Sequence, residues 1–238
     1  MELKSFFEEG LANDLFMAQR HYFIFRTIGE HAHLINKFKD SNKAKNLAYL
    51  QSASENMVIL SLSKIYDAQS KNKKYLVRSL QSLLHSEAFL SGEFPYELDY
   101  LDSFNELQKI SGIPFQGNII KSQEDLFEYL KSILDTELIK SKINDLKIIR
   151  DKYIVHNEHV DVNPKLQTFW EDVFVLQEVA RLMLSVVGTI FLRSEYFQFS
   201  LLGTSKIHYS ITSELFWVLK LLEEVVGKEN INIWWEDT

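Results

Sequence analysis

Arg150 and His156 have the residue types and the spacing to handle a phosphate group. The guanidinium of Arg150 is planar and permanently charged, and its paired N–H donors fit phosphate or carboxylate oxygens. His156 follows after five intervening residues, in the stretch RDKYIVH. An imidazole titrates near neutral pH and can therefore donate or accept a proton. Together the two side chains could bind an anion and move a proton beside it.

The residues that follow the arginine offer a second chemistry, metal coordination. The stretch HNEHVD, residues 156–161, carries imidazole and carboxylate groups that a divalent metal accepts. A solvated polar helix end explains these residues more simply, so we expect no metal and no other cofactor. His31 and His33 are two positions apart and would not share a helical face. With no cysteine in the chain, thiolate zinc sites, disulfides and a cysteine nucleophile are excluded.

An amphipathic helix must position Arg150. With a turn of about 100° per residue, Arg150 falls inside one broad arc of apolar residues. This arc consists of Leu138, Ile139, Ile143, Leu146, Ile149, Tyr153 and Ile154. His156 lies at the edge of the arc and Asn157 close to Ile139, so the inward side becomes polar at the helix end. A buried, unpaired cation is costly. The guanidinium must therefore either meet a carboxylate or line a solvent-filled cleft.

The spacing of six positions creates a geometric difficulty. Residues six apart on an α-helix differ by about 120°, so Arg150 and His156 do not lie on one line. They can converge if the helix loosens near Val155, or if two chains of a symmetric dimer bring equivalent motifs together. On the opposite side, Ile148 and Val155 are either two exposed aliphatic residues or a second contact surface.

The same residues carry a resemblance to a known superfamily. Arg150, the polar Asp151 and the histidine after four more residues resemble the HEPN signature of an arginine, a polar residue, three to five residues and a histidine. The stretch VILSLSKIYDAQSKNKKYLVRSLQSLL, residues 58–84, looks like the abortive-infection branch of that superfamily. HEPN proteins are all-α domains of bacterial toxins, abortive-infection proteins and RNA-cleaving effectors. The resemblance spans about residues 40–195 and implies a HEPN-like helical bundle with long antiparallel helices.

What the resemblance implies is metal-independent RNA cleavage at a composite site formed by two HEPN domains. A HEPN endoribonuclease of this kind would act as a toxin or as a phage-defence effector. In this interpretation His156 transfers a proton or orients the 2′-hydroxyl, and Arg150 holds the scissile phosphate. Asp151 has at most an orienting role, and Asn157 could hydrogen-bond the phosphate. Tyr153 is counted with them as a supporting residue.

The partners expected from this interpretation are RNA, a second copy of the chain, and an antitoxin or another partner protein. Lys147 and Lys152 make the helix locally positive and are the candidate RNA contacts, with a second basic segment at residues 71–78. The net charge of −7 argues against broad nucleic-acid binding. Lysines on the outer face of a helix are also an ordinary solvated surface.

Two other functions stay open. One is a non-catalytic HEPN-like helical module that binds a partner protein or a nucleotide, with Arg150 as a structural ion-pair residue. The other, a more distant one, is a metal-dependent hydrolase built on the residues 156–161. Stability and metal content would separate these functions from the ribonuclease.

Composition predicts one all-α domain over residues 1–238. With 238 residues, 46% of them hydrophobic, the chain can bury a sizeable core. Only 8 glycines and 3 prolines occur, too few for a turn-rich all-β fold. The N-terminus MELKSFFEEGLAND lacks the pattern of a signal peptide, and Arg181 interrupts the longest apolar run. We therefore expect a soluble cytoplasmic protein without a membrane partner.

Local signals predict where some helices begin and end. Ser122, with Asp125 three residues further on, has the pattern of a capping box for a long helix that runs to about Val155. Residues 166–192 are apolar around most of the helix circumference, which predicts a central helix. Gly227 is expected to end the last helix.

Overall fold

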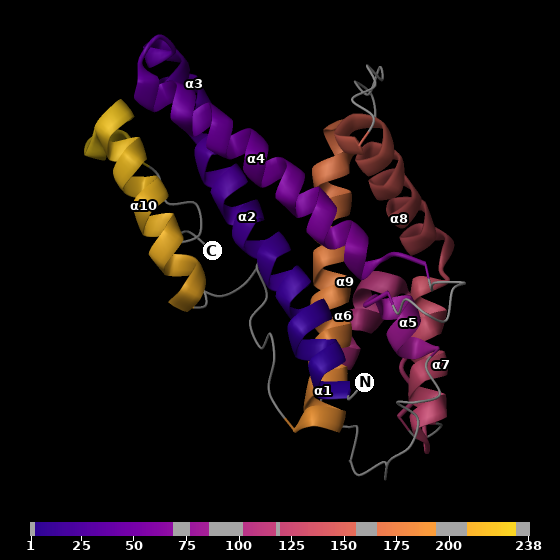
Figure 1. Cartoon of the computed structure of the whole chain (residues 1–238). Coiled ribbons are helices and arrows are strands. Elements are labelled where there is room, and N and C mark those ends of the chain that lie inside the picture. Colours follow the sequence, from indigo (N-terminus) through magenta and orange to yellow (C-terminus); the bar gives the residue numbers. More distant parts are fainter. Residues whose placement is uncertain are drawn as a thin grey trace. The chain divides into compact units, whose positions relative to one another are not determined.

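The fold is helical throughout the described part of the chain. The computed structural model describes residues 3–68, 77–85, 102–117, 120–155, 166–193 and 209–231 (Figure 1). Within these ranges every regular element is a helix and none is a strand. The expected all-α, HEPN-like helical bundle is therefore confirmed.

Four of the described helices are long, namely α2, α4, α9 and α10, and the others are shorter. In chain order the described elements are α1 (Leu3–Phe6), the π-helical turn η1 (Phe7–Ala12), α2 (Asn13–Glu30), α3 (Ala32–Ile35), η2 (Asn36–Phe38), α4 (Asn42–Ile65), α5 (Leu80–Leu84), α6 (Asp102–Ser111), α7 (Gln123–Leu134), α8 (Glu137–Ile149), the π-helical turn η5 (Arg150–Val155), α9 (Leu166–Leu192), α10 (Tyr209–Val226) and η6 (Lys228–Asn230).

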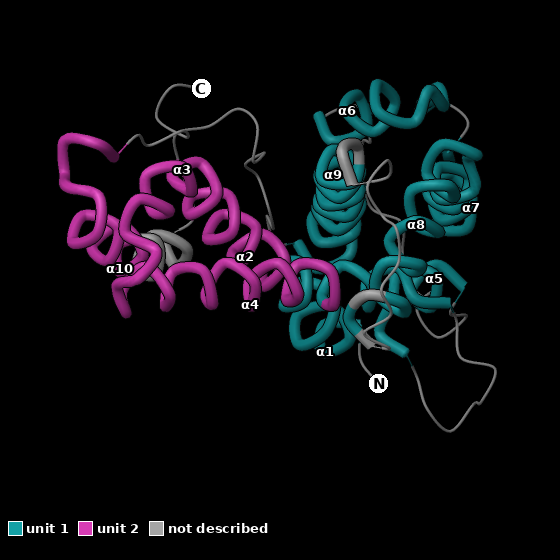
Figure 2. The backbone as a smooth tube through the Cα atoms, turned by 90° about the horizontal axis from the view of Figure 1, so that it is seen from above, with its two compact units in different colours: residues 1–15, 61–198 teal, residues 16–60, 199–238 magenta. Residues whose placement is uncertain are grey.

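The chain divides into two compact units, which Figure 2 distinguishes by colour. Unit 1 comprises Met1–Leu15 and Ser61–Gln198, and unit 2 comprises Phe16–Leu60 and Phe199–Thr238. The divisions fall inside α2 and α4, so each of these two helices contributes residues to both units. The single domain expected over residues 1–238 stays a prediction.

The central helix of unit 1 is α9, as the apolar stretch 166–192 predicted. It packs against α6 and α8, and its buried residues lie on all sides of the helix. By length and composition the part Phe169–Leu192, with a hydropathy of 1.7 in its most apolar window, could cross a membrane, but 78% of that window is buried inside the protein. Burial of this kind is typical of a core helix. Its two buried charges, Glu178 and Arg181, pair with each other at 2.9 Å.

The prediction of one continuous helix from Ser122 to about Val155 is wrong, because the structure has two helices there, α7 and α8. Thr136 lies at the break with an extended backbone (ψ 142°), and its Oγ1 accepts a hydrogen bond from the Ile139 N–H at 3.3 Å. A threonine that caps a new helix in this way satisfies one of the free N–H groups of its first turn. The apolar spacing continues across the break, so the pattern alone did not reveal it.

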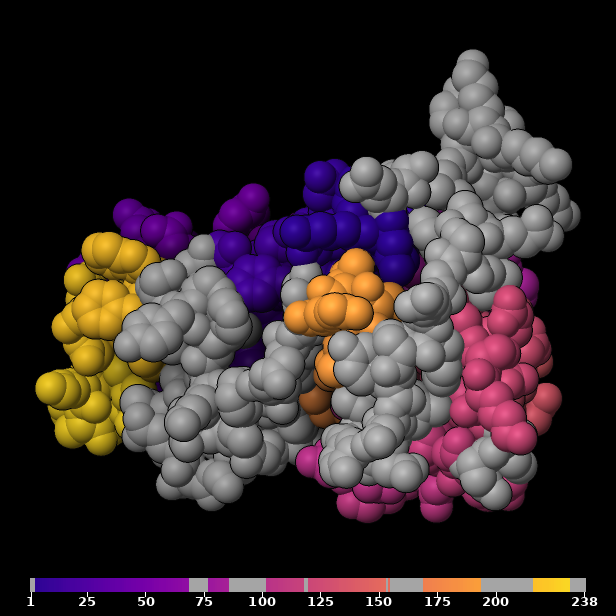
Figure 3. Space-filling view, turned by 90° about the horizontal axis from the view of Figure 1, so that it is seen from below, coloured from indigo at the N-terminus to yellow at the C-terminus, as the bar shows by residue number. Residues whose placement is uncertain are grey.

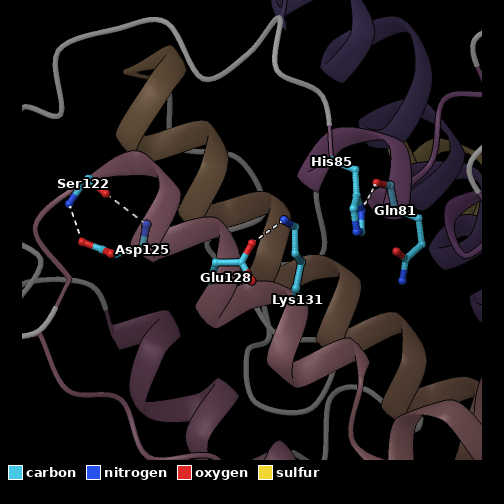
Figure 4. A network of polar contacts seen from close by, with 6 residues as sticks. All are labelled: Gln81, His85, Ser122, Asp125, Glu128 and Lys131. Atoms are coloured by element: carbon cyan, nitrogen blue, oxygen red, sulfur yellow. Dashed lines mark hydrogen bonds and ion pairs between the residues drawn. The ribbon is translucent and has the colours of Figure 1, made fainter.

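Two predicted helix ends are confirmed. Ser122 and Asp125 form the expected capping box at the start of α7, in which the Ser122 hydroxyl accepts from the Asp125 N–H at 3.1 Å (Figure 4). The Asp125 carboxylate accepts in return from the Ser122 N–H at 3.0 Å and also from the Lys121 N–H at 3.0 Å. The bond from Lys121, followed by those with Ser122, lowers the pKa of Asp125. Gly227 ends α10 with a φ of +85°, a left-handed conformation that favours glycine.

The core of unit 2 forms where α2, α3, α4 and α10 meet. Its buried residues include Ile28 from α2, Leu47 from α4 and Leu222 from α10. An ion pair of 2.6 Å between Lys43 and Glu224 joins α4 and α10 at the surface. The described side chains of α10 are yellow in Figure 3. Two aromatic side chains of this helix are exposed. These are Phe216, 52% exposed, and Trp217, 71% exposed.

Candidate functional site

Arg150 lies where the regular helix α8 ends and the π-helical turn η5 begins. Ile139, Leu146 and Ile149 of α8 are buried, as their place on the apolar arc predicted. Leu138, which was placed on the same arc, is 50% exposed. Burial of the first three fixes the face of α8 that leads to the arginine. The Arg150 side chain is 22% exposed, so it lies at the edge of the core.

The helix loosens at Arg150. In η5, which spans Arg150–Val155, the hydrogen bonds of the α-helix give way to the wider i→i+5 pattern. Such single π-turns are rare, and they occur frequently at functional sites. A loosening near Val155 is one of the two ways in which Arg150 and His156 were expected to converge, and the turn spans that position. His156 itself lies outside the described residues.

Two carboxylates hold the guanidinium of Arg150. Its Nη1 donates to Oδ1 of Asp67 at 2.9 Å, and its Nε donates to Oδ1 of Asp151 at 2.7 Å. The hydrogen bond to Asp151 and, after it, the contacts with Asp67 raise the pKa of Arg150, whereas burial works in the opposite direction. Of the two expected environments, a carboxylate or a wet cleft, the first is therefore present.

Asp67 occupies a defined position because the residue before it is anchored. Tyr66 is fully buried, and its hydroxyl donates to the carbonyl oxygen of Leu176 in α9 at 2.6 Å. Burial raises the pKa of Tyr66, so the phenol keeps its proton and remains a donor. The Asp67 N–H donates to the Lys64 carbonyl at 3.3 Å, which continues the last turn of α4. These bonds tie the Asp67 backbone to the core of unit 1.

The hydrogen bonds to Asp67 and Asp151 do not engage all the N–H groups of the Arg150 guanidinium. Arginine has five N–H bonds in a fixed planar fork. The bonds to Asp67 and Asp151 engage Nε and Nη1, and Nη2 has no hydrogen-bond partner in the part of the chain that the structure describes. Both carboxylates are partly exposed, with 36% and 52% of their side-chain area accessible. The Arg150 side chain is itself 22% exposed, and its one positive charge faces two negative charges.

Lys147 and Lys152 stand apart from the other basic residues of this helix. Neither forms an ion pair with a described carboxylate, and Lys152 is exposed, whereas Lys147 is half-buried. By contrast, Lys140 pairs with Asp135 at 3.2 Å and Lys142 pairs with Asp172. The two lysines nearest Arg150 thus remain available to an anionic ligand.

The second basic segment contributes little that the structure describes. Arg78 pairs with Glu9 at 3.5 Å, and its aliphatic stem packs on Gly10, where an added Cβ would meet Arg78 Cδ at 2.5 Å. Its guanidinium is therefore engaged within unit 1. The three lysines of this segment lie outside the described residues.

Of the remaining predicted site residues, Asp151 lies within the described ranges, and the others lie partly or wholly outside them. The Asp151 carboxylate accepts the hydrogen bond from Nε of Arg150. For Tyr153 the structure describes the backbone within η5 but not the side chain. Asn157 and the rest of the stretch 156–161 lie beyond the described ranges.

No other described group suggests metal chemistry. In the described ranges no cluster of three or more histidine, aspartate or glutamate side chains could hold a metal ion. His31 is buried, and its Nδ1–H can donate to the Thr27 carbonyl oxygen at 2.8 Å, while His33 is exposed. His31 is therefore a hydrogen-bonded core residue, and His33 is a surface residue.

A comparison with protein families decides the assignment of the chain. The model HEPN_AbiU2, described as AbiU2, matches residues 1–211. The chain belongs to the HEPN AbiU2 family. The match covers more of the chain than the residues 40–195 on which the resemblance rested, and it includes Arg150 and His156. This HEPN AbiU2 protein is accordingly an abortive-infection module of the HEPN type. Neither the curated proteins nor the solved structures contain a significant match.

Asp67 is the residue of this HEPN AbiU2 site that the sequence analysis missed. It lies 83 positions before Arg150 in the chain, and no sequence pattern connects the two. One local signal was present, because Asp67 is a single acidic residue directly after the apolar end of a long helix, in SKIYDAQS. The requirement that Arg150 meet a carboxylate makes such an acid a candidate.

Proposed function

We propose that this HEPN AbiU2 protein is a metal-independent endoribonuclease that acts in abortive infection, as a toxin or as a phage-defence effector. One observation supports this most: Arg150 is half-buried at a helix end, where it is the first residue of a π-turn. Its Nη2 has no hydrogen-bond partner among the described residues. The segment with His156 follows directly. RNA is the substrate, a homodimer in the cytoplasm is the active form, and an antitoxin or other partner protein controls it.

The proposed reaction is transesterification at an RNA phosphate. The 2′-oxygen forms a bond to phosphorus, and the bond from phosphorus to the 5′-oxygen breaks, which leaves a 2′,3′-cyclic phosphate and a 5′-hydroxyl. The imidazole of His156 accepts the proton of the 2′-hydroxyl and returns it to the leaving 5′-oxygen. Nη2 of Arg150 donates to a non-bridging phosphate oxygen, where negative charge increases in the transition state. Asn157 and Tyr153 support this arrangement.

The two carboxylates beside Arg150 do not prevent phosphate binding. Ion pairs between partly exposed groups contribute only about 0–1 kcal/mol because water screens them. A phosphate can therefore bind to the remaining N–H groups of Arg150, or it can replace one carboxylate at a small cost. Lys147 and Lys152 add positive charge along the path of the RNA backbone.

The test is cleavage of RNA by the purified full-length chain with and without EDTA. We expect a labelled oligoribonucleotide to be cut equally in both conditions, with 2′,3′-cyclic phosphate ends. The matched oligonucleotide with 2′-deoxyribose at every position should remain intact because it lacks the nucleophile. Loss of cleavage in EDTA, or a folded dimeric protein that leaves every RNA intact, would contradict the proposal.

The ion pair between Arg150 and Asp67 also favours a second function, a non-catalytic helical module that binds a partner protein or a nucleotide. In such a module Arg150 would join the end of α4 to the end of α8 and have no ligand. Replacement of Arg150 would then unfold the protein, and replacement of His156 would change neither growth nor RNA. The ribonuclease predicts the opposite pattern.

A further inference from the structure

We propose that Asp67 is a positioning residue, which holds the guanidinium of Arg150 so that Nη2 is presented to a phosphate of the RNA. The inference rests on the proposed ribonuclease function and adds to it a residue from a different helix. Asp67 does not touch the substrate in this account. It acts through Arg150 alone.

Two hydrogen bonds on different nitrogens fix the orientation of the Arg150 guanidinium. One hydrogen bond would leave the plane free to rotate about that contact, whereas two bonds on different nitrogens fix its orientation. The bonds at Nη1 (2.9 Å to Asp67) and at Nε (2.7 Å to Asp151) are of this kind. Because the five N–H bonds of arginine form a rigid fork, fixing these two nitrogens also fixes the direction of both N–H bonds of Nη2.

The two carboxylates that bind Arg150 differ in how they are attached to the fold. Asp151 is the chain neighbour of Arg150 within the same π-turn, and 52% of its side chain is exposed. The carboxylate and the arginine that it contacts thus belong to one turn. Asp67 follows Tyr66, which is fully buried and bonded to the Leu176 carbonyl in α9 at 2.6 Å. Asp67 therefore connects Arg150 to the core helix through the neighbouring Tyr66.

The alternative role for Asp67 is a latch that competes with phosphate for the same arginine. A latch must cover the donors that the phosphate needs, and it must be released before reaction. Here the carboxylate engages one nitrogen, and Nη2 stays without a described partner. Positioning predicts that loss of the carboxylate lowers the rate, and a latch predicts that it raises the rate.

The test compares Asp67→Ala and Asp67→Asn with Asp135→Asn in the full-length chain. Asp135 is a matched control because it also pairs with a basic side chain, Lys140, at 3.2 Å. We expect Asp67→Ala to lower kcat about 10- to 100-fold with little change in KM, since a misplaced catalytic group costs this much. Asp67→Asn should be intermediate because its amide oxygen still accepts from Nη1. Asp135→Asn should match the wild type. Equal or higher kcat in Asp67→Ala overturns the proposal.

A second measurement keeps this inference separate from the ribonuclease proposal. In the ¹H–¹⁵N NMR spectrum, the Arg150 side-chain signals, assigned by their absence in Arg150→Lys, report how freely the guanidinium rotates. We expect separate, slowly exchanging signals in the wild type and averaged ones in Asp67→Ala, with both proteins folded. If the two spectra agree, Asp67 does not position Arg150. If the spectra differ while no RNA is cut, the positioning holds and the ribonuclease proposal fails.

Discussion

Replacement of His156 with alanine is expected to lower metal-free RNA cleavage by about 10²- to 10⁴-fold, the usual contribution of a positioned general acid or base. The transesterification requires one proton to leave the 2′-hydroxyl and one to reach the 5′-oxygen, and alanine can transfer neither. The rate is measured in EDTA with a labelled oligoribonucleotide in excess, so that kcat is compared directly. Binding of the uncleavable 2′-deoxy analogue should change little, because Arg150 and the lysines remain.

His33→Ala provides the matched control for this result. His33 is an exposed histidine of the same chain, and it lies in unit 2, outside the proposed site. We expect its variant to cleave RNA at the wild-type rate. A His156→Ala protein with undiminished cleavage would remove the histidine from the mechanism.

Replacement of Arg150 with alanine is expected to lower kcat by about 10²- to 10³-fold, as the loss of a single charge-stabilising donor does in other phosphate or oxyanion sites. The unfolding free energy should change by no more than about 1 kcal/mol, because both ion pairs of Arg150 are partly exposed and screened. Arg150→Lys should not restore the rate, since an ammonium group cannot reproduce the planar fork. Cleavage assays and urea denaturation measure the two quantities.

Arg26→Ala is the control for removal of an arginine. Arg26 is 40% exposed and pairs with Glu30 at 3.4 Å, and it lies in unit 2. We expect this variant to retain full activity and stability. If Arg150→Ala instead unfolds the protein while His156→Ala is silent in every RNA assay, Arg150 is a structural ion-pair residue, and the partner-binding module is the better account.

Several features of the fold were predictable because they depend on residues close together in sequence. The capping box of Ser122 and Asp125 is a local pattern that spans four positions. The central helix α9 was evident from apolar residues on all its faces, and its bounds coincide with the predicted stretch 166–192. Gly227 ends α10 because the left-handed conformation there suits glycine.

Other features depend on choices that the sequence pattern does not distinguish. The break at Thr136 replaces one long helix by two, although the apolar spacing continues through it. No residue type in the stretch 150–155 marks the wider turn that begins at Arg150. The need of Arg150 for a carboxylate followed from electrostatics, but the identity of Asp67 required the tertiary contact.

In the proposed mechanism an RNA phosphate binds between Arg150 and His156, where two copies of the chain meet. The most direct measurement is a crystal structure of the full chain with an RNA whose scissile 2′-hydroxyl is methylated, so that it binds but cannot react. We predict a phosphate oxygen at hydrogen-bond distance, about 2.7–3.2 Å, from Nη2 of Arg150, with the His156 imidazole beside the blocked 2′-oxygen. RNA bound elsewhere, with Arg150 still held by Asp67 and no phosphate at Nη2, would contradict the account.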